Sequence, residues 1–190
     1  GPAAQVVQSV TVVSITPANP AISIGVGNAH ACGIDSAQTA WCWGWNLVGE
    51  LGNGSTVDSS TPVQVSGISG ISQVSAGNPF ACALRTDGTV WCWGDNVTGE
   101  LGNGSTVDSS TPVQVNGLSG VSQVSAGYYS TCALRTDGAV WCWGLNQYGQ
   151  LGNGSTVDSS TPVQVSGISG VSQVSAGDPF ACALRTDGTV

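Results

Sequence analysis

A tandem repeat constrains this sequence more than any other feature. The stretch LGNGSTVDSSTPVQV occurs unchanged at 51–65, 101–115 and 151–165, which gives a period of fifty residues. Each period contains short apolar runs that are rich in valine and bounded by glycine, proline, serine or asparagine, a pattern typical of β-strands. Four such runs per period is the number of strands in a propeller blade. The sequence therefore predicts an all-β, propeller-like array of about four four-stranded blades.

The repeat also predicts how the chain is organised. We expect one repeat domain over residues 1–190, in which the segment 1–24 holds an N-terminal strand and the start of the first blade. The last repeat ends at Val190, where the other repeats continue with Trp-Cys-Trp-Gly, so the fourth blade is expected to lack one strand. The repeats are predicted at about 11–60, 61–110, 111–160 and 161–190.

The seven cysteines follow the period as three pairs ten residues apart and one cysteine left over. This spacing disfavours a structural zinc site, which uses short Cys-x2-4-Cys knuckles, and leaves disulfides or buried free thiols. A three-residue turn at Thr86-Asp87-Gly88 would place Cys82 directly opposite Cys92, within reach of a disulfide. The predicted bonds are Cys32–Cys42, Cys82–Cys92 and Cys132–Cys142, with Cys182 as an unpaired thiol. Disulfides of this kind indicate a secreted, extracellular protein.

Tryptophan recurs on the same predicted hairpins. Because side chains alternate along a strand, Trp91 and Trp93 lie on the face opposite Cys92, across from the small Ala83 and Ala81. Large indoles that meet small side chains are suited to packing between neighbouring blades, although exposed indoles would equally suit a carbohydrate. The same interblade role is predicted for Trp41, Trp43, Trp141 and Trp143.

Charged side chains are scarce. The chain has three Lys+Arg and eleven Asp+Glu, for a net charge of −8. Since no basic surface is available, we expect no binding to nucleic acid or to anionic membranes. No apolar run is long enough for membrane insertion. Hydrophobic residues make up 41% of the sequence, which is enough to form a packed core.

The sequence predicts no catalytic, metal or cofactor site. The acids recur with the period at Asp58, Asp108 and Asp158, which indicates roles in turns, whereas an active site would break the symmetry of the repeat. His30 has no repeated counterpart and is interpreted as a substitution in the terminal blade. We therefore expect a protein that is not an enzyme, and enzymatic activity is kept only as a third class of function.

Four asparagines begin Asn-x-Ser/Thr sequons for N-linked glycosylation. Their recurrence follows from the duplication, and their use depends on the host cell. The candidate sites are Asn53, Asn96, Asn103 and Asn153.

The repeat resembles that of the regulator of chromosome condensation family, which has bacterial secreted members. The resemblance rests on the run A-L-R-T-D-G-x-V-W-C-W-G, followed by N-x-x-G-Q/E-L-G-N-G, and covers 25–190. It implies a β-propeller of four-stranded blades that serves mainly as a binding scaffold. The family includes a nuclear exchange factor for a small GTPase that docks on chromatin. The acidic charge and the paired cysteines are unsuited to the nucleus, so we do not extend the exchange activity to this chain.

Two functions compete for such a chain. In the first, the segment formed by Gln5, Val6, Val7, Gln8 and Val10 of one copy fills the open last blade of the next copy, which produces a ring or a filament. In the second, this segment fills the open blade of its own chain and forms a small closed propeller that binds a protein or carbohydrate. An unpaired edge beside a spare strand favours self-assembly. We therefore expect an extracellular structural protein whose main partner is itself.

Overall fold

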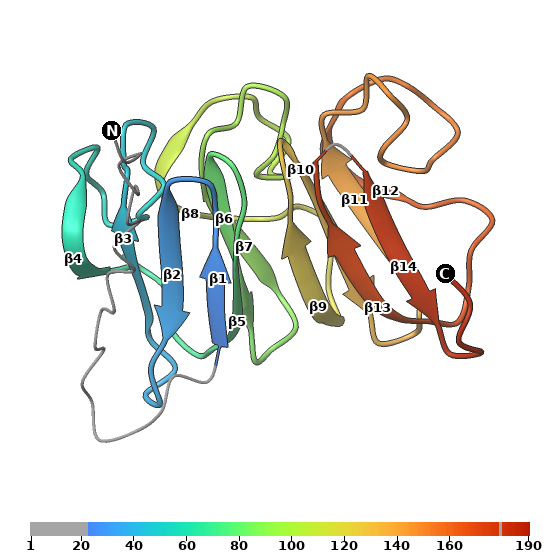
Figure 1. Ribbon diagram of the computed structural model, residues 1–190, viewed down its shortest axis with the longest axis horizontal. Helices are drawn as coiled ribbons and strands as arrows, with labels where there is room; N and C mark the ends of the chain where they lie inside the picture. Colours follow the sequence, from blue (N-terminus) through green and yellow to red (C-terminus); the bar gives the residue numbers. More distant parts are fainter. Residues whose placement is uncertain (1–22, 179) are drawn as a thin grey trace, which may run out of the picture.

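The computed structural model describes residues 23–178 and 180–190. The regular structure in this part of the chain is β-strand, arranged as antiparallel sheets that lie in a row along the molecule (Figure 1). The all-β, propeller-like class is as predicted. The assembly strand predicted at 5–10 lies outside the described residues.

Three of the sheets have four strands and one has two. Within each sheet the spatial order of the strands follows the chain, which is the meander of a propeller blade. The first sheet contains β1 (Ser23–Val26), β2 (His30–Ile34), β3 (Ala40–Gly44) and β4 (Ser59–Gln64). The second contains β5 (Ile71–Ala76), β6 (Phe80–Arg85), β7 (Val90–Gly94) and β8 (Ser109–Gln114). The third contains β9 (Val121–Ala126), β10 (Ser130–Arg135), β11 (Val140–Gly144) and β12 (Ser159–Gln164), and the fourth β13 (Val171–Ala176) and β14 (Ala181–Arg185).

The blades are shifted relative to the repeats predicted from the sequence. The Ser-Ser-Thr-Pro-Val-Gln strand, predicted to open each repeat, is instead the outer strand of the preceding sheet, because β4 pairs with β3, β8 with β7 and β12 with β11. The loop before this outer strand brings the chain back to the sheet that it has just left. In the first sheet the two ends of the loop are joined by a hydrogen bond of 2.8 Å from the backbone N–H of Asn46 to Asp58 Oδ1. The last sheet therefore has two strands rather than the three predicted. The sheets span 23–64, 71–114, 121–164 and 171–185 instead of the predicted repeat limits.

The central hairpin of each blade has the predicted register. In the second blade Cys82 lies opposite Cys92. The three-residue turn is closed by a hydrogen bond of 2.9 Å from the backbone N–H of Arg85 to the carbonyl oxygen of Thr89. Gly88 has a φ of 79°, the left-handed conformation that such a turn requires.

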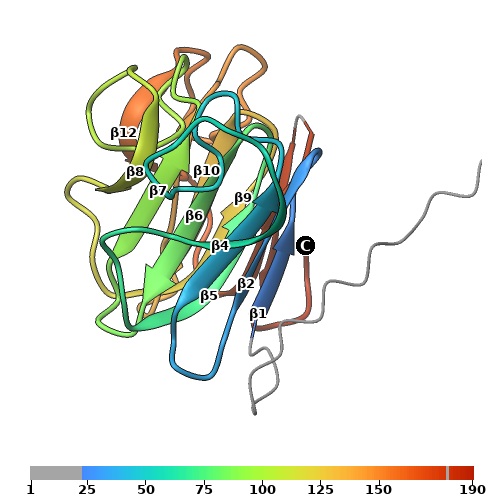
Figure 2. The ribbon, with the colours of Figure 1, turned by 90° about the vertical axis from the view of Figure 1, so that its left-hand side faces the viewer.

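The sheets stack face to face. Strands β1 and β2 contact β5, β5 and β6 contact β9, and β9 and β10 contact β13. Seen from the first blade, the sheets lie one behind another (Figure 2). The core is accordingly divided into apolar layers between neighbouring sheets. In the first layer the Cys32–Cys42 disulfide of one sheet packs with Ala81, Ala83 and Trp93 of the next.

Glutamine side chains on the inner strands add polar links between the blades. The Nε2 of Gln73 donates to the carbonyl oxygen of Val124 at 2.9 Å, and the backbone N–H of Val124 donates to Gln73 Oε1 at 3.0 Å. Gln123 makes the same pair of bonds with Val174, at 2.9 Å each. Each glutamine side-chain amide thus both donates to and accepts from one residue of the next blade, as a residue of a neighbouring strand would. These paired bonds fix the position of adjacent blades relative to each other.

Candidate functional site

Two of the predicted interblade tryptophans are fully buried anchors. Trp93 and Trp143 are 0% exposed, and each packs in the apolar layer shared with the preceding sheet. The indole N–H of Trp93 donates to the backbone carbonyl oxygen of Glu50 at 2.8 Å, and that of Trp143 to Glu100 at 2.7 Å. The predicted interblade role is confirmed for these two residues.

The surface that receives such an indole is called the indole socket here. In the first blade it consists of the backbone carbonyl of Glu50, Leu51 and Gly52. In the second blade it consists of the backbone carbonyl of Glu100, Leu101 and Gly102. A Cβ on Gly52 would lie 2.8 Å from the indole nitrogen of Trp93, and one on Gly102 would lie 2.8 Å from that of Trp143. Glycine is needed because a larger side chain would displace the indole.

The other four predicted tryptophans are only half-buried. Trp141 packs against the layer between the second and third sheets. The indole of Trp41 donates to Asp35 Oδ2 at 2.9 Å, so its polar end is used within its own blade. The half-buried residues are Trp41, Trp43, Trp91 and Trp141.

The three predicted disulfides are present. Their Cα atoms are 4.1, 4.0 and 4.1 Å apart for Cys32–Cys42, Cys82–Cys92 and Cys132–Cys142. Cys182 is a free and exposed thiol, as predicted. Three disulfides indicate an oxidising environment.

A buried asparagine organises the long loop of each complete blade. The Nδ2 of Asn96 donates to the carbonyl oxygens of Ser105 and Val107 at 3.0 Å each, and its Oδ1 accepts from the backbone N–H of Leu101 at 2.9 Å. Asp108 accepts from the backbone N–H of Asn96 at 2.9 Å, which is the turn role predicted for the recurring aspartates. The equivalent pairs are Asn46 with Asp58 and Asn146 with Asp158.

This loop corrects one predicted glycosylation site. Asn96 is 0% exposed and both of its N–H groups are used, so the folded chain does not present it for glycosylation. The other three sequons stay predictions. Their asparagines are half-buried and accept a hydrogen bond of 3.0 Å from the backbone N–H two residues later: Asn53, Asn103 and Asn153.

Two buried acids in these loops were not recognised from the sequence. Glu50 and Glu100 are 2% and 0% exposed, and burial raises the pKa of both carboxyls. Glu100 accepts from the backbone N–H of Thr98 at 2.9 Å. Gln150 has the same role in the third blade, where its Oε1 accepts from the backbone N–H of Tyr148 at 2.9 Å. The repeated N-x-x-G-E/Q motif contained a signal for this role, because its last position is Glu in two blades and Gln in the third. This exchange indicates that the position needs a hydrogen-bond acceptor rather than a charge.

His30 is a buried residue at the start of β2. Its side chain is 5% exposed, and burial lowers its pKa to about 4. Phe80 and Ser130 occupy the same register in β6 and β10, since all three lie opposite the last glycine of the next strand. His30 is therefore a substitution within the repeat, as predicted. Within the described ranges no three His, Cys, Asp or Glu side chains cluster as a metal site would require.

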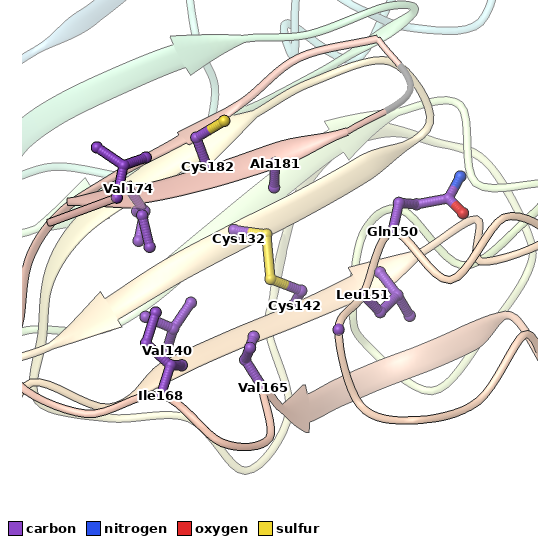
Figure 3. A pocket seen from close by; sticks show the side chains of 13 residues that line it. Cys132, Val140, Cys142, Gln150, Leu151, Val165, Ile168, Val174, Ala181 and Cys182 are labelled. Atoms are coloured by element: carbon purple, nitrogen blue, oxygen red, sulfur yellow. A yellow bond between two sulfur atoms is a disulfide. The ribbon is translucent and has the colours of Figure 1, made fainter. Parts of the chain in front are cut away.

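The fourth sheet has an open strand edge. β14 pairs with β13 on one side, and no described strand pairs with its other side. In the complete blades this second side carries the Trp-Cys-Trp-Gly strand. A cavity of about 300 Å³ opens beside the edge, around the Cys132–Cys142 disulfide (Figure 3). We call the edge and its cavity the open-blade site, which is lined by Val140, Leu151, Val165, Ile168, Val174 and Ala181, among others.

The described lining of the open-blade site is mostly apolar. Its described lining contains no acid and no imidazole, and its one reactive group is the thiol of Cys182. The Nε2 of Gln150 at its rim has no hydrogen-bond partner, although the residue is 8% exposed. The site therefore combines apolar surface with unpaired polar groups, as a surface for an added strand does.

Across the described residues, no helix is long and apolar enough to cross a membrane.

Comparison with known families decides which group of proteins this architecture represents. The model of the Regulator of chromosome condensation (RCC1) repeat matches residues 39–84, 87–134 and 137–184, and a second RCC1 repeat model matches 71–100 and 121–150. The chain belongs to the RCC1 repeat family. Each match to the first model extends from the hairpin of one blade into that of the next, so an RCC1 repeat in the sequence bridges two sheets.

Solved structures place this RCC1-repeat chain beside larger propellers. Yeast RCC1 (Prp20) in its complex with Kap60 is 26% identical with a TM-score of 0.72, over 87% of this chain and 41% of the yeast chain. Prp20p from Saccharomyces cerevisiae, a protein with described binding properties to Gsp1p and histones, is 24% identical with a TM-score of 0.72, over 87% and 42%. The chain therefore spans about two fifths of these relatives. The computationally designed Ika4 protein shares the fold at 12% identity and a TM-score of 0.55, over 92% of this chain and 91% of its own. No curated protein matches the chain.

Proposed function

We propose that this RCC1-repeat chain is a non-enzymatic, extracellular structural protein that assembles with its own copies through the open-blade site. The observation that carries the proposal is the unpaired edge of β14 beside an apolar cavity. The free N–H and C=O groups of an edge strand are a template for another strand. The donor is the N-terminal segment of a second copy, which consists of Gln5, Val6, Val7, Gln8 and Val10.

The two ends of the row of sheets support a head-to-tail arrangement. The first sheet exposes Ile24 and Val26, at 70% and 75%, and at the other end Leu184 in the last sheet and Phe180 directly before it are 37% and 63% exposed. These sheets lie at opposite ends of the row (Figure 1). Two different surfaces that bind each other make a heterologous contact, which forms rings or filaments. The three disulfides fit a protein that works outside the cell.

The mass of the particles in non-reducing buffer tests this function. Light scattering coupled to size exclusion should show oligomers of the 18.9 kDa chain that grow with concentration. Deletion of residues 1–10 should abolish assembly, and Val7→Pro should do the same because proline cannot donate to a strand ladder. A Val157→Ala variant, altered at an exposed loop position, is the matched control and should assemble normally. A monomer that persists on concentration would exclude the assembly.

A closed binding module is the second candidate function. A hollow of about 360 Å³ is lined by one loop from each of the four sheets, and Tyr128 at its rim is 37% exposed. A half-exposed tyrosine offers both an apolar face and a hydroxyl to a protein or carbohydrate ligand. In this case the chain stays monomeric, and deletion of residues 1–10 lowers its stability without changing its oligomeric state.

A further inference from the structure

One of the seven tryptophans does not follow the repeat. The other six lie in the Trp-Cys-Trp-Gly strands at the centre of the blades. Trp45 comes directly after this pattern in the first blade, where the second and third blades have Asp95 and Leu145. Its side chain is 49% exposed, whereas Asp95 is buried and Leu145 is half-buried. Packing between blades therefore does not account for this indole.

Trp45 lines an open hollow of about 330 Å³ between the first and second blades. Three loops form it: the turn between β1 and β2, the loop after β3, and the turn between β5 and β6. Small-molecule sites have volumes of roughly 300–1,000 Å³, so the hollow is large enough for a small ligand. We call it the Trp45 cleft, which is lined by Asn28, His30, Trp45, Leu47, Glu50 and Asn78, among others.

The cleft is a place where the three complete blades differ from one another. Three of its lining positions hold a different residue in each blade. These sets are His30, Phe80 and Ser130; Trp45, Asp95 and Leu145; and Leu47, Val97 and Gln147. The stretch that follows the loop is, by contrast, identical at 51–65, 101–115 and 151–165. A site for one ligand breaks the symmetry of a repeat in this way, because its residues have a task that the other copies do not share.

Most polar groups of the cleft are uncharged. Asn28 is exposed and Asn78 is half-buried, so both side-chain amides are open to a ligand. The Nε2 of His30 is buried and has no hydrogen-bond partner among the described residues, and its pKa of about 4 keeps the ring neutral at pH 7. Glu50 is 2% exposed, and its Oε2 already accepts from the backbone N–H of Val48 at 3.0 Å. The cleft therefore offers mainly neutral donors and acceptors.

An exposed indole beside amide groups suits a saccharide. In a glucose-type ring the hydroxyl groups lie around the edge and C–H groups cover both faces, so a face can pack on an aromatic ring while the edge forms hydrogen bonds. The described lining contains no arginine or lysine, which disfavours an anionic ligand. A cationic ligand needs an accessible carboxylate, and that of Glu50 is buried.

We propose that the Trp45 cleft binds a neutral oligosaccharide made of glucose-type rings. One ring packs against the exposed face of Trp45, and its hydroxyl groups pair with the side-chain amides of Asn28 and Asn78. A further hydroxyl supplies the partner that the Nε2 of His30 lacks. Both asparagines also line the hollow of about 360 Å³ at Tyr128, so the two hollows meet and a chain of sugars can continue from one into the other.

This inference goes beyond the proposed self-assembly and does not depend on it. The Trp45 cleft lies between the first two blades and shares no lining residue with the open-blade site. It gives the second candidate function, ligand binding, a ligand class and a set of contact residues.

Isothermal titration calorimetry on the full chain tests the ligand class. The probes are cellotriose and maltotriose, two neutral glucose trisaccharides with different linkages, and at least one of them should bind. Chitosan trisaccharide has the linkage of cellotriose but carries a protonated amine on each ring at pH 6, and it should bind more weakly. Equal or tighter binding of the cationic sugar would overturn the neutral class. If neither glucose trisaccharide binds, the whole inference fails.

Substitutions at the indole test the place of binding. Trp45→Leu introduces the residue that Leu145 provides in the third blade, so the chain should fold, and affinity should fall by about tenfold or more. Trp45→Tyr keeps an aromatic face and should retain most of the affinity. Val97→Ala, at the exposed counterpart of Leu47 in the second blade, is the matched control and should bind normally. Unchanged binding by Trp45→Leu would overturn the cleft as the site, and an equal loss in Trp45→Tyr would overturn the stacking.

Two further measurements separate the contacts and the functions. His30→Phe, which introduces the residue of Phe80, should weaken binding by about threefold because the ring loses its nitrogens. Unchanged affinity in this variant would overturn the contact with His30. Light scattering of Trp45→Leu should show the same particle mass as the unaltered chain, so loss of sugar binding and loss of assembly are distinguished.

Discussion

The indole N–H of Trp143 donates a hydrogen bond of 2.7 Å to the backbone carbonyl oxygen of Glu100 in the preceding blade. The hydroxyl of Thr131 donates to the same oxygen at 3.2 Å. Trp93 and Glu50 repeat the relationship one blade earlier. Because the acceptor is a main-chain group, the blades are joined in a way that does not depend on the side chain at the acceptor position. The fold of the array therefore depends strongly on the buried indoles.

Trp143→Phe should lower the free energy of unfolding by about 2–3 kcal/mol, since it leaves a cavity and removes a buried hydrogen bond. Trp141→Phe is the matched control on the same strand. Its indole is half-buried, so we expect a loss of less than about 1 kcal/mol. Urea denaturation of the two variants measures the difference, and equal losses would contradict the anchor role of Trp143.

Glu100→Gln should raise stability at pH 7. The folded state holds the proton of Glu100 more tightly than the unfolded chain does, because burial raises its pKa above 4.5. Stability therefore falls as pH rises from this unfolded value through the raised folded one, and the penalty is complete above it. The amide keeps the acceptor that Gln150 already provides in the third blade. Melting temperatures between pH 4 and 8 should show a flatter profile for Glu100→Gln.

Gln150→Glu is the reciprocal control for this position. It should introduce the pH penalty in the third blade and lower the melting temperature at pH 7. A lower melting temperature of Glu100→Gln at pH 7 would show instead that the charge itself stabilises the loop.

His30→Phe should remove a loss of stability in mild acid. Burial lowers the pKa of His30 from 6.5 to about 4, so the folded state resists protonation. Stability is complete above pH 6.5 and is lost as pH falls through this window, by up to about 3 kcal/mol. Phenylalanine already occupies this register at Phe80, which is 0% exposed. Denaturation at pH 4.5 and pH 7.5 compares the two proteins, and an unchanged difference between the two pH values would contradict the role of His30.

Replacement of Cys82 and Cys92 together by alanine should cost about 2.5–3 kcal/mol, because the disulfide closes a short ring that restricts the unfolded chain. Cys182→Ala is the control and should have little effect, since Cys182 is free and exposed. A thiol assay supplies a second measurement. One thiol should react in the native chain and seven after reduction in denaturant, and a native count other than one would contradict the assigned pairing.

The hairpins could be predicted from the sequence because their geometry is local. A three-residue turn that ends in a glycine fixes which residues face each other, so Cys82 opposite Cys92 followed from counting alone. The alternation of side chains likewise indicated that Trp93 and Ala81 share a face. The interblade role of Trp93 needed only this alternation and the small size of its neighbours.

The limits of the blades could not be predicted in this way. The strand that begins at Ser59 has the same sequence pattern whether it opens a sheet or closes one, and the long loop before it decides between these. The burial of Asn96 could not be predicted either, because a buried sequon in a glycine-rich loop has the same sequence pattern as an exposed one. The inner-strand links of Gln73 join residues that lie in different repeats.

The sequence by itself determined the repeat, the strands, the hairpin register and the three disulfides, because the repeat can be found by comparing the sequence with itself and each disulfide lies within a single hairpin. The tertiary structure alone decided which sheet each outer strand joins and which tryptophans are anchors. These features depend on contacts between blades about fifty residues apart in the chain, and the stacking of the sheets sets those distances.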